Sequence, residues 1–273
     1  MTAIRVFDGK ANPHEPFWYF GNTLEGSEEP VLELYGYISE FSWFEDDITP
    51  RLFKDDLWRY GNGGPITIRM NSYGGDVIAA SVMSSILREY PGKVTVQIDG
   101  IAASAATVVA LSGDTIRIQD TAYFMIHDPL AVFFLAALNI EELKRLANSL
   151  QSVKEGIVNT YQTKTGLSRD RLSKMMTDET WMDANRALDL GFVDEVISAA
   201  QPIPIQIPSN VAVANALRNY ANVPPAVMQA LNLMNVPETQ VSSEPLLTDD
   251  MKREAQSLCE RVSLILKKEE HHA

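Results

Sequence analysis

The chain has 273 residues, of which 45% are hydrophobic, so it can fill the core of one large domain, or of a domain with an appendage. Its net charge of -13, with no cluster of Lys and Arg, excludes the usual nucleic-acid binder. The single cysteine, Cys259, excludes an internal disulfide. Since there is no signal-like start and no apolar run of bilayer length, we expect a cytoplasmic protein without a membrane partner.

Strand-like and helix-like segments alternate through the first half of the chain. Runs rich in β-branched and aromatic residues predict strands at 31–38, 66–70, 93–98, 115–118 and 122–127. Amphipathic or apolar patterns between them predict helices at 49–61, 74–90 and 104–113. Strand alternating with helix predicts a layered α/β fold with a mainly parallel sheet.

A long amphipathic helix is predicted over 140–165, with Gly166 placed to end it. It is much longer than the average helix of about 11 residues, and such a helix often meets another subunit. Two short helices follow, with Ser168 and Asp183 as their N-caps, and then a strand over 192–197. The apolar residues of the long helix recur at steps of three and four: Leu143, Leu146, Leu150, Val153, Ile157 and Tyr161.

The character of the chain changes near residue 200. Prolines punctuate 202–208, the stretch 235–250 is typical of a linker, and 248–270 is amphipathic and predicts a helix. We therefore expect an N-terminal segment over 1–30, one folded domain over 31–200, and a C-terminal extension over 201–273 with a linker and an amphipathic helix.

The stretch "NSYGGDV" at 71–77 places Gly74 and Gly75 where the chain turns from strand into helix. A phosphate loop needs GxxxxGK[ST] and a dinucleotide loop needs GxGxxG; neither pattern is present. Asp76 at the predicted helix start would also repel a phosphate. Two interpretations remain, a tight turn without function and a glycine N–H that holds a developing oxyanion.

Two further strand ends carry a candidate nucleophile and a candidate base. Ser104 lies in "DGIAASAATVV", before a buried helix whose first N–H groups favour an oxyanion, although a serine there is most often only a helix cap. Of four histidines, only His127, in "AYFMIHDP", belongs to the predicted core; an ordinary hydrogen-bonded core histidine is the alternative. Catalytic groups gather at strand ends of open α/β sheets, so the combination favours nucleophilic catalysis.

A third residue, an acid, should orient the imidazole. Acids after His127 are plentiful, and spacing alone does not choose among them. Asp178 and Glu179, in "MMTDETWMDA", lie in a predicted connection between two short helices. The alternative is that both are solvated loop charges.

Four motifs in order, "NSYGGDV", "DGIAASAA", "MIHDP" and "ALDLGFVDEV", resemble the ClpP family of serine proteases, and most closely its phage and prophage head maturation proteases. The match covers 31–197. The resemblance implies a ClpP/crotonase-like layered fold of repeated βαβ units with a protruding handle helix, which makes 31–200 a ClpP-like protease domain. It also implies a serine endopeptidase without metal or organic cofactor, assembled as a heptameric ring or stacked tetradecamer. Bacterial members work with a AAA+ unfoldase, whereas phage relatives are expected to cut scaffold or capsid precursors.

The resemblance assigns roles residue by residue. Ser104 is the nucleophile, His127 the general base, and the amides of Gly75 and Ala105 form the oxyanion hole. The acid falls on Glu179, where the family usually has Asp, with Asp178 as the fallback.

The sequence departs from the family's pattern in three further places. Tyr73 stands where the family usually has proline, "AVFFLAALN" replaces the glycine-rich segment after the histidine, and the region beyond 200 has no counterpart in the plain bacterial enzyme.

Two other classes of protein stay open. A crotonase-type acyl-CoA hydratase or isomerase has a related fold and a similar oxyanion hole, but it uses Glu or Asp in place of a Ser–His pair. An inactive, structural ring subunit would need no acid at all.

Overall fold

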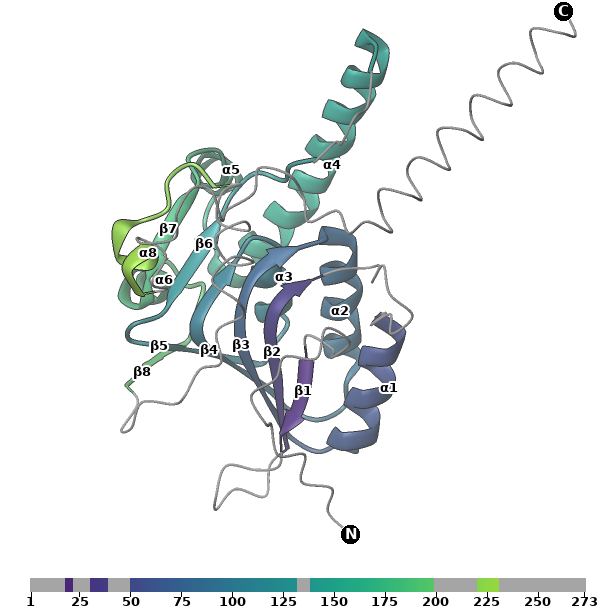
Figure 1. Cartoon of the computed structure of the whole chain (residues 1–273), viewed down its shortest axis with the longest axis vertical. Helices are drawn as coiled ribbons and strands as arrows, with labels where there is room; N and C mark the ends of the chain where they lie inside the picture. Colours follow the sequence, from purple (N-terminus) through teal and green to yellow (C-terminus); the bar gives the residue numbers. More distant parts are fainter. Residues whose placement is uncertain (1–17, 22–29, 39–49, 132–137, 199–219, 231–273) are drawn as a thin grey trace, which may run out of the picture.

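The computed structural model describes residues 18–21, 30–38, 50–131, 138–198 and 220–230 (Figure 1). The helix predicted over 248–270, the run 132–137, and Cys259 lie outside this part of the chain. None of the described helices has the length and apolarity needed to cross a membrane.

Within these described ranges, a mainly parallel sheet of eight strands forms the centre of the molecule. β6 pairs in parallel with the end of β4, and β7 pairs antiparallel with β6. β1 is also antiparallel, at the edge beside β2, whereas the remaining neighbours are parallel. The strands along the main path are β1 (Trp18–Gly21), β2 (Val31–Ile38), β3 (Ile66–Gly75), β4 (Val94–Ala103), β5 (Thr115–Gln119) and β8 (Glu195–Ile197); the others are β6 (Tyr123–Ile126) and β7 (Thr180–Asp183).

Helices cover one face of this sheet, and a long helix projects from it (Figure 1). α1, α2 and α3 lie on the covered face, and α4 extends beyond the body of the molecule. The layered α/β fold with a protruding helix, predicted from the sequence, is confirmed. The helices are α1 (Pro50–Gly61), α2 (Val77–Glu89), α3 (Ala105–Ala110), α4 (Ile140–Thr165), α5 (Arg169–Thr177), α6 (Ala184–Asp189) and α8 (Pro225–Ala230).

The two faces of the sheet differ in chemistry because successive strand residues point to opposite sides. Ile68 of β3 is fully buried in the core, where Phe53 and Leu57 of α1 also lie. Burying a side chain of this size stabilises the fold by roughly 1.5–3 kcal/mol. The neighbouring Arg69 instead meets Asp99 of β4, with 2.8 Å between Nε and Oδ2.

Most helices begin and end close to the residues predicted from the sequence, because capping residues are present there. α4 begins at a capping box formed by Asn139 and Glu142 and ends at Gly166, whose φ of 70° is left-handed. Ser168 and Asp183 cap α5 and α6 as predicted.

The structure corrects the prediction at the paired glycines. They end β3 instead of opening a helix, because pairing with β2 continues through Ile38 and Gly75, and α2 starts only after Asp76.

Candidate active site

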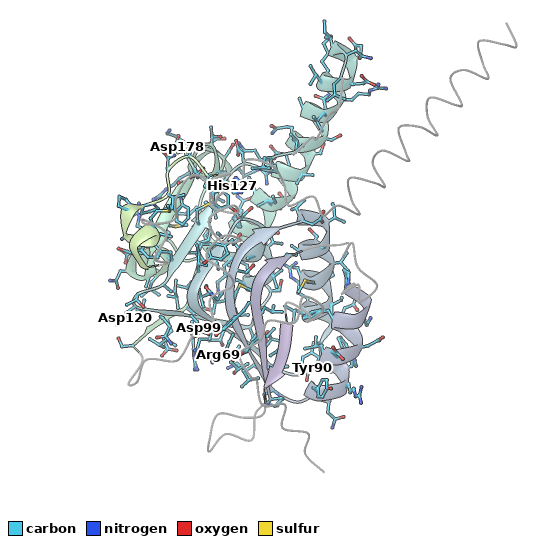
Figure 2. The ribbon with its side chains drawn as sticks, viewed as in Figure 1. Arg69, Tyr90, Asp99, Asp120, His127 and Asp178 are labelled. Carbon is cyan, nitrogen blue, oxygen red and sulfur yellow. The ribbon has the colours of Figure 1, made fainter. Side chains whose placement is uncertain are left out.

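Three strand ends meet at one edge of the sheet. β4 lies between β3 and β6, and all three run parallel, so their carboxyl ends lie together. Gly75 ends β3, Ser104 follows β4 and His127 follows β6. Figure 2 shows His127 toward one end of the sheet, with Arg69 and Asp99 toward the opposite end.

Ser104 sits in a strained turn between β4 and α3. Its φ of 56° and ψ of -128° are unusual for a residue with a side chain, and such strain persists only where the surroundings enforce it. The Ser104 amide donates to the Met125 carbonyl at 2.9 Å, and its carbonyl accepts from the Thr107 amide and hydroxyl. Ser104 occupies the N-cap position, but its hydroxyl makes no capping bond. The side chain is therefore directed elsewhere.

The Ser104 hydroxyl contacts the imidazole of His127. The Oγ atom lies 2.6 Å from Nε2, which is a short hydrogen bond. With Nε2 accepting, the other ring nitrogen carries the proton, and this tautomer lets the imidazole remove the hydroxyl proton.

Both glycines are sterically required beside this pair. A β-carbon at Gly74 would stand 2.6 Å from the Ala103 carbonyl oxygen and 2.8 Å from the Ser104 β-carbon. A β-carbon at Gly75 would stand 2.0 Å from the Ile38 carbonyl oxygen. The bare backbone thus lets the end of β3 approach both the Ser104 turn and β2.

The amides of Gly75 and Ala105, predicted to form the oxyanion hole, lie at the end of β3 and at the start of α3. The Asp76 amide, directly after Gly75, donates to the Ile38 carbonyl at 2.8 Å. Ala105 is the first residue of α3, where the leading N–H groups have no partner within a helix. The role of the Gly75 and Ala105 amides in holding an oxyanion stays a prediction.

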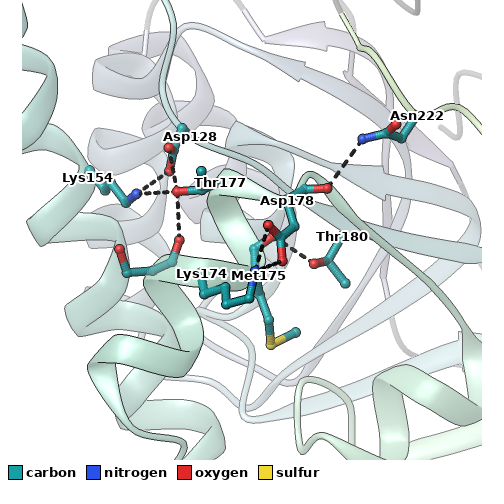
Figure 3. A network of polar contacts seen from close by, with 9 residues as sticks. Asp128, Lys154, Lys174, Met175, Thr177, Asp178, Thr180 and Asn222 are labelled. Carbon is teal, nitrogen blue, oxygen red and sulfur yellow. Dashed lines mark hydrogen bonds and ion pairs between the residues drawn. The ribbon is translucent and has the colours of Figure 1, made fainter.

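Burial is the main influence on the His127 imidazole. It lowers the pKa of His127 below the ordinary value of about 6.5, and the carboxylates of Glu179 and Asp128 partly oppose this. Asp128 is held by the base of α4, with 2.7 Å between its Oδ1 and Lys154 Nζ. Thr177 of α5 also donates to Asp128, at 2.9 Å (Figure 3).

Neither predicted acid is hydrogen-bonded to His127 within the described ranges. Asp178 pairs with Lys174, 2.7 Å from Oδ2 to Nζ, on the surface (Figure 3). Glu179 accepts from the amides of Ala221 and Asn222, both at 2.7 Å. Ser104 and His127 are thus in contact. The carboxylate of Glu179 influences the pKa of the imidazole, but its hydrogen bonds are with the amides of Ala221 and Asn222.

Residues 220–230 were not singled out in the sequence, yet they pack against the site. The Tyr220 ring lies 5.0 Å from the His127 ring, and its hydroxyl donates to the Tyr73 carbonyl at 2.7 Å. The one local signal was proline at 225, the first position of α8, where proline suits a helix start.

Metal-binding residues do not gather in the ranges that the structure describes: no group of three or more His, Cys, Asp or Glu side chains is placed to hold an ion there.

Comparison with known families shows which family the chain belongs to. The Clp protease family model matches residues 58–200, just over half of the chain. The chain belongs to the Clp protease family. Family membership makes this Clp protease a serine-type peptidase, which separates it from the crotonase-type hydratases considered above.

Curated relatives and a solved structure agree with the assignment. Proteolytic subunit 1 of the ATP-dependent Clp protease of Chlamydia abortus is 31% identical over 137 residues, which cover 50% of this chain and 71% of the relative. The corresponding subunit of Protochlamydia amoebophila is 28% identical over 143 residues, 52% of this chain and 69% of the relative. A ClpP1 point mutant from Listeria monocytogenes superposes with a TM-score of 0.53 at 25% identity, covering 62% of this chain and 92% of that one.

Proposed function

We propose that this Clp protease is an endopeptidase that uses Ser104 as nucleophile and His127 as general base. The single observation that carries the proposal is the 2.6 Å contact between Ser104 Oγ and His127 Nε2, at the edge where β3, β4 and β6 end. In this geometry one group can take the proton that the other must lose.

The proposed reaction has two stages. His127 takes the proton as Ser104 Oγ attacks the peptide carbonyl, and the amides of Gly75 and Ala105 hold the oxyanion. His127 then gives the proton to the leaving amine as the C–N bond breaks. Water, activated by the same imidazole, releases the acyl group and restores the serine.

Glu179 is the proposed acid, with its carboxylate accepting from His127 Nδ1 in the working state. Support comes from its influence on the His127 pKa and from the engagement of Asp178 by Lys174. The proposed assignment therefore requires the Glu179 carboxylate to change partner.

Labelling with a fluorophosphonate tests the proposed nucleophile. We expect the full-length protein to be modified at Ser104, as shown by peptide mass spectrometry, and heat-unfolded protein to remain unmodified. Modification at a different serine, with Ser104 intact, would remove the basis of the proposal.

The proposed substrates are phage scaffold or capsid precursors, and the motif resemblance to head maturation proteases supports this. The alternative is a general proteolytic subunit serving a AAA+ unfoldase, which is favoured by the names of the curated relatives. Degradation of a folded protein that depends on ATP and an added unfoldase would favour the alternative. Precursor cleavage without ATP would favour the maturation protease.

A homo-oligomeric ring is the proposed assembly. The start of α4, far from the sheet, exposes Ile140 at 70% and Leu143 at 50%, which suits burial against another copy. Light scattering should give a mass of at least seven chains. A monomer at high concentration would contradict it.

In the resting state that the structure shows, the His127 imidazole should titrate with a midpoint below 6.5. Burial lowers the pKa of His127, so the imidazole should stay neutral to lower pH than that of an exposed histidine. Glu179→Gln should move the midpoint further down, because it removes a carboxylate that raises this pKa. Asp178→Asn is the matched control and should leave the midpoint in place. NMR titration of the imidazole in the full-length protein gives the midpoints, and a midpoint above 6.5 would contradict the expectation.

The same shift predicts a stability change. Because the folded pKa is lower, the unfolded chain binds the proton first as pH falls. The contribution of His127 to stability is therefore fully present above about pH 6.5 and is lost as pH falls through the window down to the folded pKa.

A further inference from the structure

The carboxylate of Glu179 is engaged by residues near the C-terminal part of the described chain. Its Oε2 accepts from the Ala221 amide and its Oε1 from the Asn222 amide, both at 2.7 Å, and Trp181 Nε1 donates to Oε1 at 3.1 Å. Bonds from amides to an ionised carboxylate are stronger than neutral ones. While they last, the two oxygens are turned to the backbone of 221–222 and not to the imidazole.

Tyr220, the residue before Ala221, contacts two further parts of the site, the turn at Tyr73 and the ring of His127. Its hydroxyl donates to the carbonyl of Tyr73, directly before the paired glycines. Its ring meets the His127 ring edge to face, with centroids 5.0 Å apart and an interplanar angle of 75°. Tyr220 therefore spans the space between the proposed oxyanion turn and the proposed base.

Val227 anchors the same segment in an apolar pocket. Its side chain is only 3% exposed and packs in a small cluster separate from the main core. Figure 1 shows α8 beside β7 and α6, on the side of the molecule away from α1. The buried members of this cluster are Tyr73, Ile101, Ala103, Met125 and Val227.

We propose that residues 220–228 form an intramolecular latch that holds the protease in a latent state, and that peptide hydrolysis requires this latch to leave Glu179. The inference rests on the proposed roles of Ser104 and His127.

Each anchor touches a different part of the machinery, and this distinguishes a latch from incidental packing. The amides of 221 and 222 occupy the acid, Tyr220 lies against the base, and Val227 fills a pocket lined by residues from β4 and β6, the strands that lead into Ser104 and His127. Release of the segment would free Glu179 for Nδ1 of His127 and uncover the imidazole. In the latent state the carboxylate of Glu179 accepts from the amides of 221 and 222, and in the active state it accepts from His127 Nδ1.

The test uses the full-length chain with Val227→Asp, which places a charge in the apolar pocket and should expel the latch. Ala226→Asp is the matched control, because it adds the same charge one residue earlier, at an exposed position of α8. We expect Val227→Asp to raise the rate of fluorophosphonate labelling and of peptide hydrolysis at least about tenfold, and Ala226→Asp to leave both unchanged. Hydrogen exchange at the amides of 221 and 222 should also accelerate in Val227→Asp alone.

The outcomes separate the latch from the proposed function. If these amides exchange faster while labelling stays equal or slows, the segment supports the site and the latch is wrong, although the serine peptidase stands. If neither the parent nor any variant is labelled, the proposed function fails and the latch with it. Should Val227→Asp not fold, Tyr220→Phe removes the hydroxyl bond to Tyr73 and keeps the ring, and a roughly fivefold increase in both rates is expected. Unchanged or slower labelling of that variant would equally overturn the latch.

Discussion

Ser104→Ala should lower kcat/KM for a peptide substrate by about 10⁴- to 10⁶-fold, the range seen when the nucleophile of such a constellation is removed. The loss is large because the alanine side chain cannot form the acyl-enzyme. Residual turnover would come from substrate binding and the oxyanion amides alone. Steady-state kinetics with a fluorogenic peptide, on protein whose thermal unfolding matches the parent, measures the effect.

Two companion variants show whether the effect belongs to the chemistry. Ser84→Ala removes a buried serine, bonded to Ser112 at 2.6 Å and remote from His127 in the chain, and should retain nearly full activity. Adding His127→Ala to Ser104→Ala should cost little more than the single change, because the two residues act as one unit. Activity of Ser104→Ala within tenfold of the parent would show that another group is the nucleophile.

Gly75→Ala should destabilise the fold by at least about 3 kcal/mol, since two penalties combine. Gly75 has a φ of 142°, which residues with a side chain rarely adopt, and a β-carbon would stand 2.0 Å from the Ile38 carbonyl oxygen. Relief would require β2 and β3 to separate where they pair. Urea unfolding followed by circular dichroism gives the difference.

Gly166→Ala supplies the matched comparison for Gly75→Ala. Gly166 also has a positive φ, 70°, but a β-carbon there would meet nothing within 4 Å. Only the penalty for placing a residue with a side chain in the left-handed conformation, about 1 kcal/mol, is then expected. If the two substitutions lowered the free energy of unfolding equally, the clash with the Ile38 carbonyl would contribute nothing to the effect of Gly75→Ala.

The parts of the fold predicted well from the sequence are those that local signals determine. α4 runs over Ile140–Thr165 as predicted, because a regular apolar repeat ends in a glycine that can adopt a left-handed conformation. The parallel order of β3 and β4 follows equally from alternating strands and helices. The contact between Ser104 and His127 could be predicted because Ser104 lies after one predicted strand and His127 ends another, and parallel strands bring their ends together.

The parts that were missed depend on partners distant in the chain. β7 has four residues and exists through its pairing with β6, so no periodic pattern marks it. Tyr220 bonds to Tyr73, 147 positions away, and propensity gives no sign of such a contact. The partners of Glu179 could not be predicted either, because they are backbone amides. Any residue at 221 or 222 except proline could donate such bonds, so the side chains there give no signal.

The link between Lys154 and Asp128 has a mechanical consequence. Lys154 lies in the buried part of α4, and its ammonium forms an ion pair with Asp128, the residue after His127. Thr177 is hydrogen-bonded to both Lys154 and Asp128. A neighbouring chain that tilts the far end of that helix would turn it as a lever about this point. A displacement of Asp128 would also move His127, because the two residues are adjacent in the chain. Contacts between subunits at the far end of α4 could thereby change the position of the imidazole.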